Sequence, residues 1–552
     1  MAHALAGKPV QEQDIIDVQT IVDAYFDNVP DMTNPTQLVS FGTSGHRGTS
    51  VDGTFTDFHV AAITQAICDG RKRFGATGPI FVGQDTHALS QPALVTVLEV
   101  LAGNGVTAMV DCDMDFVPTP SVSRAIIRYN EEHDDKADGI IITPSHNPPD
   151  NGGIKYNTII GGPADTVVTK WIEMRANEYL TAYCESEDFK RISIDNIEPT
   201  AQVPYDYKGL YVEELDDVIN MDAIKAAGPK VLVDTLGGSG ASYWNAIKER
   251  YGLDLTIIHD DYDPTFSFMT YDHDGKVRMD CSSPHVMASV INRIGDFDLA
   301  VGNDPDYDRY GIVVSSGLIS ANTFLTLAAR YLFTTRGWKD KGVGKTVVCT
   351  TMIDKWAASA EVPVFEVPVG FKYFSQLLFD GTIGIGGEES AGASFLKKDG
   401  RVWTTDKDGM IMALLGMEIM AVMGKSALKM AGEFVEEFGN PKFGRIDAPC
   451  KKEQKQILKQ MSAELITATT VDGDPITNIR TTSLYNDMPI DGVRVETDKG
   501  WFVARPSGTE DLYKIYGESY KGDLGLVALL TAGEEIVNAA LNGTIETESV
   551  FS

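Results

Sequence analysis

Three aspartates alternate with other residues in the segment "VGNDPDYDRYG", which spans residues 301–311. In an extended backbone Asp304, Asp306 and Asp308 project to one side, where their carboxylates would repel one another unless a cation lay between them. Oxygen ligands at this density suit a hard divalent ion such as Mg²⁺. The segment is not an EF-hand loop, because Arg309 stands where that loop needs Gly. A solvated acidic turn is the alternative, and the apolar strand before it favours the metal site.

A second segment, "IITPSHNPPDNGGIKYN" at residues 141–157, places a serine directly after an apolar run. Three prolines restrict the backbone around Ser145 and so lower the entropy lost when its hydroxyl is held in one place. His146 and Lys155 lie close enough in sequence to supply a proton acceptor or a cation beside it. A proline-rich turn with an incidental serine explains the same letters, so this segment alone leaves both interpretations open.

The segment "IGGEESAG" (385–392) carries groups suited to a sugar. Glu388 and Ser390 follow an apolar strand, and a carboxylate beside a hydroxyl can hydrogen-bond a polyol. A helix start with Glu in its first turn is an equally good interpretation of these letters.

Three aspartates leave coordination positions that Mg²⁺ commonly fills with phosphate oxygens, so the metal segment points to phosphate chemistry.

The segment "ARPSGTED" (504–511) combines a guanidinium, hydroxyls and backbone amides. Arg505, Ser507, Gly508 and Thr509 form a turn able to cradle a phosphate dianion. The alternative is an ordinary turn.

One segment imitates a nucleotide-binding motif. "GVGKT" (342–346) resembles the end of a Walker A sequence, but Lys339 stands where the first Gly is required. We also expect this segment to precede its strand, at 345–352, instead of following it. No GxSxG elbow surrounds Ser145, which disfavours a carboxyl-ester hydrolase.

Apolar runs of strand length alternate with amphipathic stretches of helix length, and this alternation must position the four segments. The first such unit is a βαβαβ pattern, which implies a parallel or mixed sheet covered on both faces. We expect its elements at 79–85, 92–105, 106–111, 119–132 and 139–143. The pattern returns twice, and a final stretch beginning with a helix at 451–466 predicts a smaller α+β domain. Ligands of open α/β sheets bind beyond the carboxyl ends of strands, where the polar segments lie.

Composition limits the partners. The chain has 552 residues, of which 47 are basic and 79 acidic, giving a net charge of −32. A field of that sign repels nucleic acid and anionic membranes, so an anionic ligand needs local cationic clusters. No run of letters approaches the apolar length of a membrane span, and the first residues lack a signal-peptide pattern. We therefore expect a cytoplasmic protein, with no nucleic-acid or membrane partner.

Six motifs together resemble the α-D-phosphohexomutase superfamily, in its bacterial phosphoglucomutase branch. They are, in order, "FGTSGHRG" (41–48), "TPSHNPPDNGGIKYN", "GNDPDYDRYG", "VPVGFKYF" (367–374), "GEESAG" and "RPSGTED". The resemblance implies a heart-shaped enzyme of four domains, with three similar α/β domains of mixed sheet and a smaller α+β domain. The domain bounds we expect, each domain giving one loop to the cleft, are 1–205, 206–320, 321–440 and 441–552.

The resemblance also implies residue roles. Ser145 matches the phosphoserine that exchanges a phosphoryl group with the sugar, and its phosphate would complete the Mg²⁺ shell of the three aspartates. Glu388 and Ser390 match the sugar-contacting pair. The remaining matches are to the distal phosphate loop (Arg505, Ser507, Gly508, Thr509), to positions near the phosphates (Arg47, Arg309, Lys372) and to proton-transfer roles (Lys155, Lys398). We also expect Arg47 and His146 to act in catalysis. We expect a proton-transfer lysine to have a pKa lowered by other cations in the cleft.

The implied reaction interconverts α-D-glucose 1-phosphate and glucose 6-phosphate, with glucose 1,6-bisphosphate as intermediate and activator. Relatives that also take mannose phosphates often carry His at the place of Gly392, so glucose is favoured. The alternatives are a sister mutase for mannose or glucosamine phosphate, a phosphosugar phosphatase, and an inactive phosphosugar-responsive binding protein. A monomer or homodimer is expected.

Overall fold

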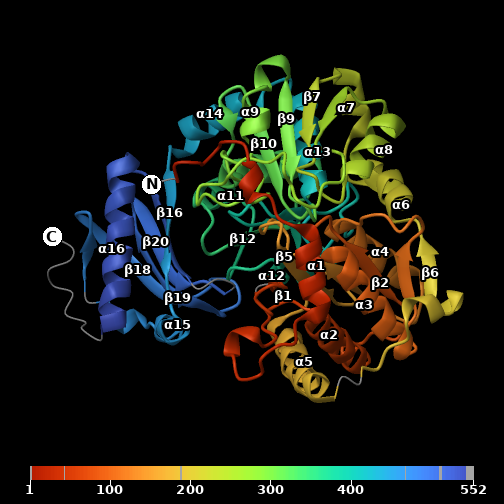
Figure 1. The fold of residues 1–552 in the computed structure, drawn as a ribbon. Helices are drawn as coiled ribbons and strands as arrows, with labels where there is room; N and C mark the ends of the chain where they lie inside the picture. Colours follow the sequence, from red (N-terminus) through yellow and green to blue (C-terminus); the bar gives the residue numbers. More distant parts are fainter. Residues whose placement is uncertain (1–2, 43, 187–188, 467, 509–511, 543–552) are drawn as a thin grey trace.

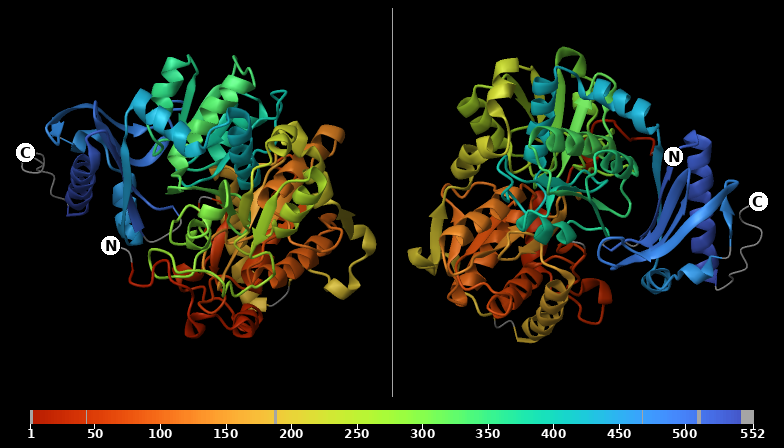
Figure 2. Two further views of the ribbon diagram at one scale, coloured as in Figure 1. Left: turned by 90° about the horizontal axis from the view of Figure 1, so that it is seen from above. Right: turned by 180° about the vertical axis from the view of Figure 1, so that it is seen from behind.

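The computed structural model describes residues 3–42, 44–186, 189–466, 468–508 and 512–542. Its strands form four sheets, and each sheet takes its strands from one continuous part of the chain (Figure 1). The fourth sheet and its helices stand beside the rest of the molecule in all views (Figure 2).

The first sheet has the strand order β1-β5-β4-β2-β3-β6. β2, β3, β4 and β6 are parallel, whereas β5 runs antiparallel to β4 and to β1. Its strands are β1 (His46–Thr49), β2 (Ile80–Gln84), β3 (Ala108–Asp111), β4 (Asp138–Ile142), β5 (Asn151–Asn157) and β6 (Gln202–Tyr205). Its helices are α1 (Val18–Asp27), α2 (Asp57–Gly70), α3 (Ser90–Gly103), α4 (Thr119–Glu132) and α5 (Thr166–Ser186).

Both faces of this sheet are covered. Ile140 and Ile142 pack into one hydrophobic cluster with α2, α3 and α5, while Ile141 between them packs with α4 on the other face. This alternation explains why "GIIIT" reads as a continuous apolar run instead of alternating with polar residues.

The second sheet has the order β11-β10-β9-β7-β8 and is also mixed. Its strands are β7 (Val231–Asp234), β8 (Leu255–Ile258), β9 (Leu299–Asn303), β10 (Tyr310–Val314) and β11 (Gly317–Leu318). The helices of this part are α6 (Tyr207–Glu214), α7 (Met221–Ala227), α8 (Ala241–Tyr251) and α9 (Ala288–Ile291).

The third sheet has the order β13-β12-β14-β15, with β15 antiparallel to β14. Its strands are β12 (Gly342–Thr346), β13 (Val364–Val367), β14 (Ile383–Gly387) and β15 (Ala393–Phe395). The helices of this part are α10 (Ala321–Thr335), α11 (Met352–Ser359), α12 (Lys372–Phe379), α13 (Gly409–Met423) and α14 (Ala427–Phe438).

The second and third sheets share one hydrophobic core. Its buried members run from Tyr211 to Phe434. Helix α13 joins them, because it follows the third sheet in the chain but packs against β9, β10 and α7.

The fourth sheet is antiparallel throughout, in the order β16-β21-β20-β19-β18-β17. Its strands are β16 (Lys442–Pro449), β17 (Thr470–Val471), β18 (Asp474–Thr482), β19 (Pro489–Thr497), β20 (Gly500–Pro506) and β21 (Leu512–Ser519). Its helices are α15 (Lys452–Lys459) and α16 (Gly522–Asn542), so the expected helix at 451–466 is shorter than predicted.

Helix α16 corrects the expectation that no segment approaches the length of a membrane span. By length and composition alone α16 passes as one, and α13 with α14 would pass as a second only if this pair, bent by 80°, were counted together. In the structure Leu529, Ile536 and Val537 of α16 are buried against the fourth sheet.

"GVGKT" is itself strand β12, and our placement of the strand at 345–352 was wrong. A Cβ added at Gly342 would lie 2.2 Å from the Phe365 ring, and one at Gly344 would lie 2.9 Å from the Phe374 ring. Glycines that lower strand propensity are therefore needed here for close packing.

The three mixed sheets repeat one feature. In each, a central parallel strand turns back into an antiparallel neighbour: β4 into β5, β9 into β10 and β14 into β15. The turns between these strands hold the serine, aspartate and glutamate segments, and Ser507 and Gly508 directly follow β20.

Candidate active site

Ser145 lies in the turn between β4 and β5 and is 1% exposed. Its backbone has φ of +62°, a conformation that non-glycine residues adopt only where the surroundings enforce it. The Ser145 amide donates to Thr143 Oγ1 at 2.7 Å, and the Ser145 hydroxyl donates to Asp304 Oδ2 at 3.0 Å. The structure thus brings the predicted nucleophile to the predicted metal segment.

Asp304, Asp306 and Asp308 are all buried, and one oxygen from each lies within 4.8 Å of the others. The turn is fixed by Arg309, whose amide donates to Asp304 Oδ1 at 2.9 Å, and by Thr119, whose hydroxyl donates to Asp306 Oδ2 at 2.8 Å. Burial, together with the two neighbouring carboxylates, holds the pKa of Asp304 well above its usual range.

The donor set fits a divalent cation. Oδ1 of Asp306 and Oδ1 of Asp308 are buried and have no hydrogen-bond partner among the described residues. Buried carboxylate oxygens without partners are costly unless a cation coordinates them. Asp304, Asp306 and Asp308 therefore suit Mg²⁺ by chemistry and arrangement.

Two lysines reach the same carboxylates. Lys155 Nζ donates to Asp306 Oδ2 at 2.5 Å and to Asp308 Oδ2 at 3.1 Å, and Lys407 Nζ lies 2.8 Å from Asp308 Oδ2. Although burial opposes it, the two aspartates raise the pKa of Lys155. The expectation of a lowered pKa is therefore wrong for Lys155 in this arrangement.

Lys398 lies elsewhere. Its ammonium donates to Asp216 Oδ1 at 3.4 Å and its amide to the Asp217 carbonyl at 2.8 Å. Lys407, which the sequence analysis did not consider, is the lysine of the third-sheet part that reaches the aspartates. The available signal was "TDKDG", a lysine between two aspartates directly before α13.

His146, Arg309 and Arg47 line the same region. His146 Nδ1 lies 3.2 Å from Ser145 Oγ, and burial together with Arg309 holds the pKa of His146 well below its usual range. Arg47, on β1, donates to the Asn147 side chain at 3.3 Å. Asp280, which no motif indicated, lies 3.5 Å from Arg309 and 4.0 Å from the outer nitrogen of His146.

Glu388 and Ser390 lie in the turn after β14. Glu388 is 6% exposed, and burial raises its pKa to about 7. A Cβ at Gly392 would lie 2.3 Å from Lys407 Cδ, so a larger residue there would displace this lysine. Gly at position 392, where relatives that take mannose phosphates often carry His, therefore leaves room for Lys407.

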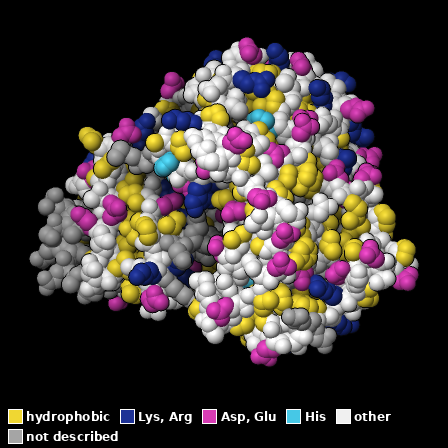
Figure 3. All heavy atoms as spheres, viewed as in Figure 1, with side chains coloured by type: hydrophobic (Ala, Val, Ile, Leu, Met, Phe, Trp, Pro, Cys, Tyr) yellow, Lys and Arg dark blue, Asp and Glu magenta, His cyan; other side chains and the backbone are white. Residues whose placement is uncertain are grey.

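The remaining predicted residues lie toward the fourth sheet. Lys372 begins α12 and donates to the Thr166 hydroxyl at 2.9 Å. Burial raises the pKa of Tyr373 on α12, and the positive charge of Arg505 on β20 lowers it. Arg505 of the fourth sheet therefore lies close enough to Tyr373 of the third-sheet part for their charges to interact. Ser507 is buried and Gly508 exposed, while Thr509 lies outside the described residues. Figure 3 shows a hollow between this part and the rest of the molecule.

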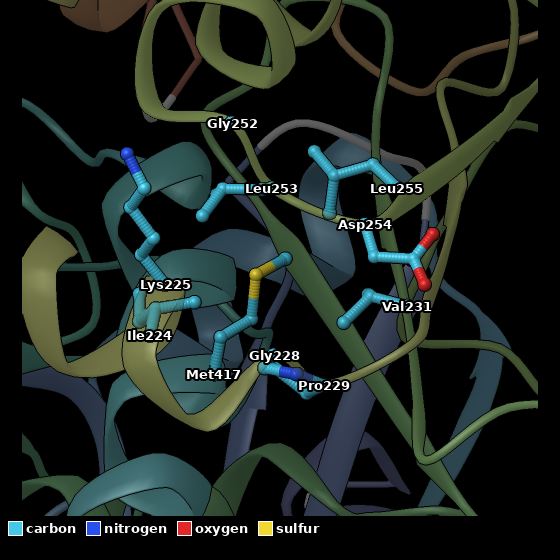
Figure 4. A pocket seen from close by; sticks show the side chains of 10 residues that line it. All are labelled: Ile224, Lys225, Gly228, Pro229, Val231, Gly252, Leu253, Asp254, Leu255 and Met417. Atoms are coloured by element: carbon cyan, nitrogen blue, oxygen red, sulfur yellow. The ribbon is translucent and has the colours of Figure 1, made fainter.

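A small pocket of roughly 70 Å³ lies in the second unit, away from these residues (Figure 4). It is bounded by the ends of α7 and α8, the start of β7 and Met417 of α13. None of the predicted site residues lines it.

The sequence matches known proteins along most of its length. Four family models match in order: phosphoglucomutase/phosphomannomutase alpha/beta/alpha domain I (38–182), domain II (210–317), domain III (320–438) and the C-terminal domain (447–524). The chain is 47% identical over 539 residues to "Phosphoglucomutase" of Komagataeibacter xylinus, covering 97% of both chains.

Solved structures share the fold. A putative phosphomannomutase from Thermus thermophilus superposes with a TM-score of 0.71 at 23% identity, over 91% of this chain and 99% of the other. The open form of parafusin, a phosphoglucomutase from Paramecium, superposes with a TM-score of 0.71 at 20% identity, over 94% and 97%. The ordered family matches and the near full-length identity show that this chain is an enzyme of the phosphoglucomutase/phosphomannomutase family, within the α-D-phosphohexomutase superfamily.

Proposed function

We propose that the enzyme interconverts α-D-glucose 1-phosphate and D-glucose 6-phosphate through a phosphorylated Ser145. The observation that carries this proposal is the contact between the Ser145 hydroxyl and the buried aspartate cluster, at 3.0 Å from Asp304. The relative named phosphoglucomutase supports glucose as the sugar.

In the proposed reaction a phosphoryl group moves from Ser145 to the sugar. A sugar hydroxyl attacks the Ser145 phosphate, the new sugar O–P bond forms, and the bond from phosphorus to Ser145 Oγ breaks. The hydroxyl proton passes to a neighbouring base, for which Lys407 lies at the cluster and His146 at the serine. The leaving Ser145 oxygen takes up a proton to restore its hydroxyl, and the Lys155 ammonium is the candidate donor. The product is glucose 1,6-bisphosphate, which must turn over in the site and return its other phosphoryl group to Ser145.

Asp304, Asp306 and Asp308 would hold Mg²⁺, with the serine phosphate completing its shell. When bound, Mg²⁺ neutralises charge on the phosphoryl oxygens in the transition state. The chain itself fixes the attack geometry, because Ser145 is held in a left-handed backbone conformation beside stiff prolines.

The sugar and its second phosphate need contacts that accept two orientations. Glu388 and Ser390 would hydrogen-bond the sugar hydroxyls, and Arg47, Arg309 and Lys372 would lie near the phosphates. Arg505, Ser507, Gly508 and Thr509 would hold the phosphate that does not react. A phosphoserine open to water would be hydrolysed, so closure of the fourth part over the site is expected.

The domain bounds remain a proposal, at 1–205, 206–320, 321–440 and 441–552. We also propose a cytoplasmic monomer or homodimer whose partners are phosphorylated hexoses.

The direct test supplies glucose 1-phosphate with Mg²⁺ and a trace of bisphosphate, and couples glucose 6-phosphate to a dehydrogenase. Turnover on glucose 1-phosphate that exceeds turnover on mannose and glucosamine phosphates supports the proposal. Release of free phosphate without isomerisation would make the enzyme a phosphatase, and binding without either reaction would make it a sensor.

A further inference from the structure

A buried polar network lies behind the Ser145 turn. Asp85 follows β2 and is 1% exposed. Its two carboxylate oxygens accept four hydrogen bonds: from Ser90 Oγ at 2.5 Å, Thr143 Oγ1 at 2.6 Å, and His87 Nδ1 and amide at 2.8 and 3.0 Å. So complete a shell of donors stabilises an ionised carboxylate in the protein interior.

His87 connects this carboxylate to the other end of the turn. It is 1% exposed, and its Nε2 lies 3.0 Å from the Asn147 carbonyl oxygen. A carbonyl oxygen and an ionised carboxylate both only accept, so both ring nitrogens of His87 must carry protons. In agreement, Asp85 raises the pKa of His87 although burial opposes it.

Thr143 makes the matching connection before the serine. Its hydroxyl gives its proton to Asp85 and accepts the Ser145 amide at 2.7 Å. The backbone is therefore held on both sides of Ser145, at its own amide and at the carbonyl of Asn147. Between these two points Ser145 has φ of +62°, which a non-glycine residue does not keep unaided.

We propose that Asp85 and His87 are positioning residues that, through Thr143 and Asn147, hold Ser145 Oγ in line for phosphoryl transfer. This inference rests on the proposed role of Ser145. Asp85 and His87 are each 1% exposed and lie behind the turn, so we expect them to affect the rate of transfer and not substrate affinity. A displacement of about 1 Å at a reacting atom costs on the order of 100-fold in rate.

The test replaces the imidazolium by a side chain of similar size without donors. His87→Leu is expected to lower kcat by about 100-fold while KM for glucose 1-phosphate changes by less than about threefold. His87→Gln keeps an amide donor for the Asn147 carbonyl and is expected to restore kcat to within about tenfold of the wild type.

His59 provides the matched control. It is also fully buried in the first unit, and its ring nitrogens lie 2.9 Å from Thr56 Oγ1 and from the Gln37 carbonyl. His59→Leu is expected to lower the melting temperature as His87→Leu does, with kcat unchanged. Equal kcat in the two leucine variants would overturn the proposal.

Hydrogen exchange measures the turn without depending on catalysis. The amides of Thr143, Ser145, His146 and Asn147 should exchange faster in His87→Leu than in the wild type, and should be unaffected in His59→Leu. If His87→Leu does not fold, Thr143→Val removes the other attachment and is expected to give the same loss of kcat and protection. Unchanged exchange in whichever of these variants folds would refute the proposal that Asp85 and His87 hold the Ser145 turn. This conclusion would stand even if the wild type proved not to be a mutase.

Discussion

Ser145 and Asp304 lie 159 positions apart in the chain, yet the serine hydroxyl donates to the aspartate at 3.0 Å inside the protein. The two residues come from equivalent turns of two different sheets, β4 to β5 and β9 to β10. The packing of one sheet unit against another therefore creates the contact between Ser145 and the carboxylate cluster.

Ser145→Ala is expected to lower mutase turnover by more than about 10⁴-fold, because no other group would carry the phosphoryl unit. Its effect on unfolding should stay near 1 kcal/mol, the worth of one hydrogen bond. Ser50→Ala is the control, since Ser50 is equally buried and donates to the Ile21 carbonyl. Near-normal turnover in Ser145→Ala, measured by the coupled assay, would refute the nucleophile role.

Asp306→Asn is expected to weaken Mg²⁺ binding by about tenfold or more, because it removes one anionic ligand. Wild-type enzyme should gain about 2.7 kcal/mol of stability at a Mg²⁺ concentration 100 times its Kd. At that concentration the stability gain of the variant should be smaller than that of the wild type by at least about 1.3 kcal/mol, measured by calorimetric unfolding. Asp113→Asn alters an exposed acidic group and should not change the response. An equal response in both variants would place the metal elsewhere.

Lys407→Met should reduce kcat by about 100-fold or more, because it removes the amine that lies 2.8 Å from Asp308 and is a candidate for proton transfer. Lys398→Met should leave kcat within about threefold, since this ammonium contacts Asp216 at the surface. The coupled assay compares the two variants directly. The reverse ranking would restore Lys398 to the role that the resemblance implied.

Glu388→Gln tests the raised pKa of the Glu388 carboxyl. Burial raises the pKa of Glu388 from 4.5 to about 7, so the folded state binds this proton more tightly than the unfolded state. The free energy of unfolding should therefore fall as pH rises from about 4.5 to 7, by at most about 3 kcal/mol. Glu388→Gln should lose this slope in denaturant titrations at pH 5 and pH 7.5. A wild-type slope retained in the variant would assign it to another group.

Local sequence patterns predicted much of the fold and part of the site. Strand β4 and helix α4 lie within one residue of their expected bounds, because uninterrupted apolar or periodic letters determine such elements locally. Strand β12 was misplaced, because Gly342 and Gly344 read as a turn until the rings of Phe365 and Phe374 are packed against them. No sequence motif contains Asp280, and only its contacts with His146 and Arg309 in the folded structure identify it as part of the candidate site.

Local patterns and the order of the motifs predicted which side chains could do the chemistry: a serine on a stiffened turn, three alternating aspartates and, at 504–511, a segment suited to phosphate. Tertiary structure alone decided which lysine joins them, because α13 crosses from the third sheet to pack on the second and so carries Lys407 to Asp308. The tertiary structure also decided the pKa shifts of the buried groups, such as Lys155, His146 and Glu388. Periodicity and propensity act over a few residues, whereas burial and charge pairing depend on neighbours that only the packed fold brings together.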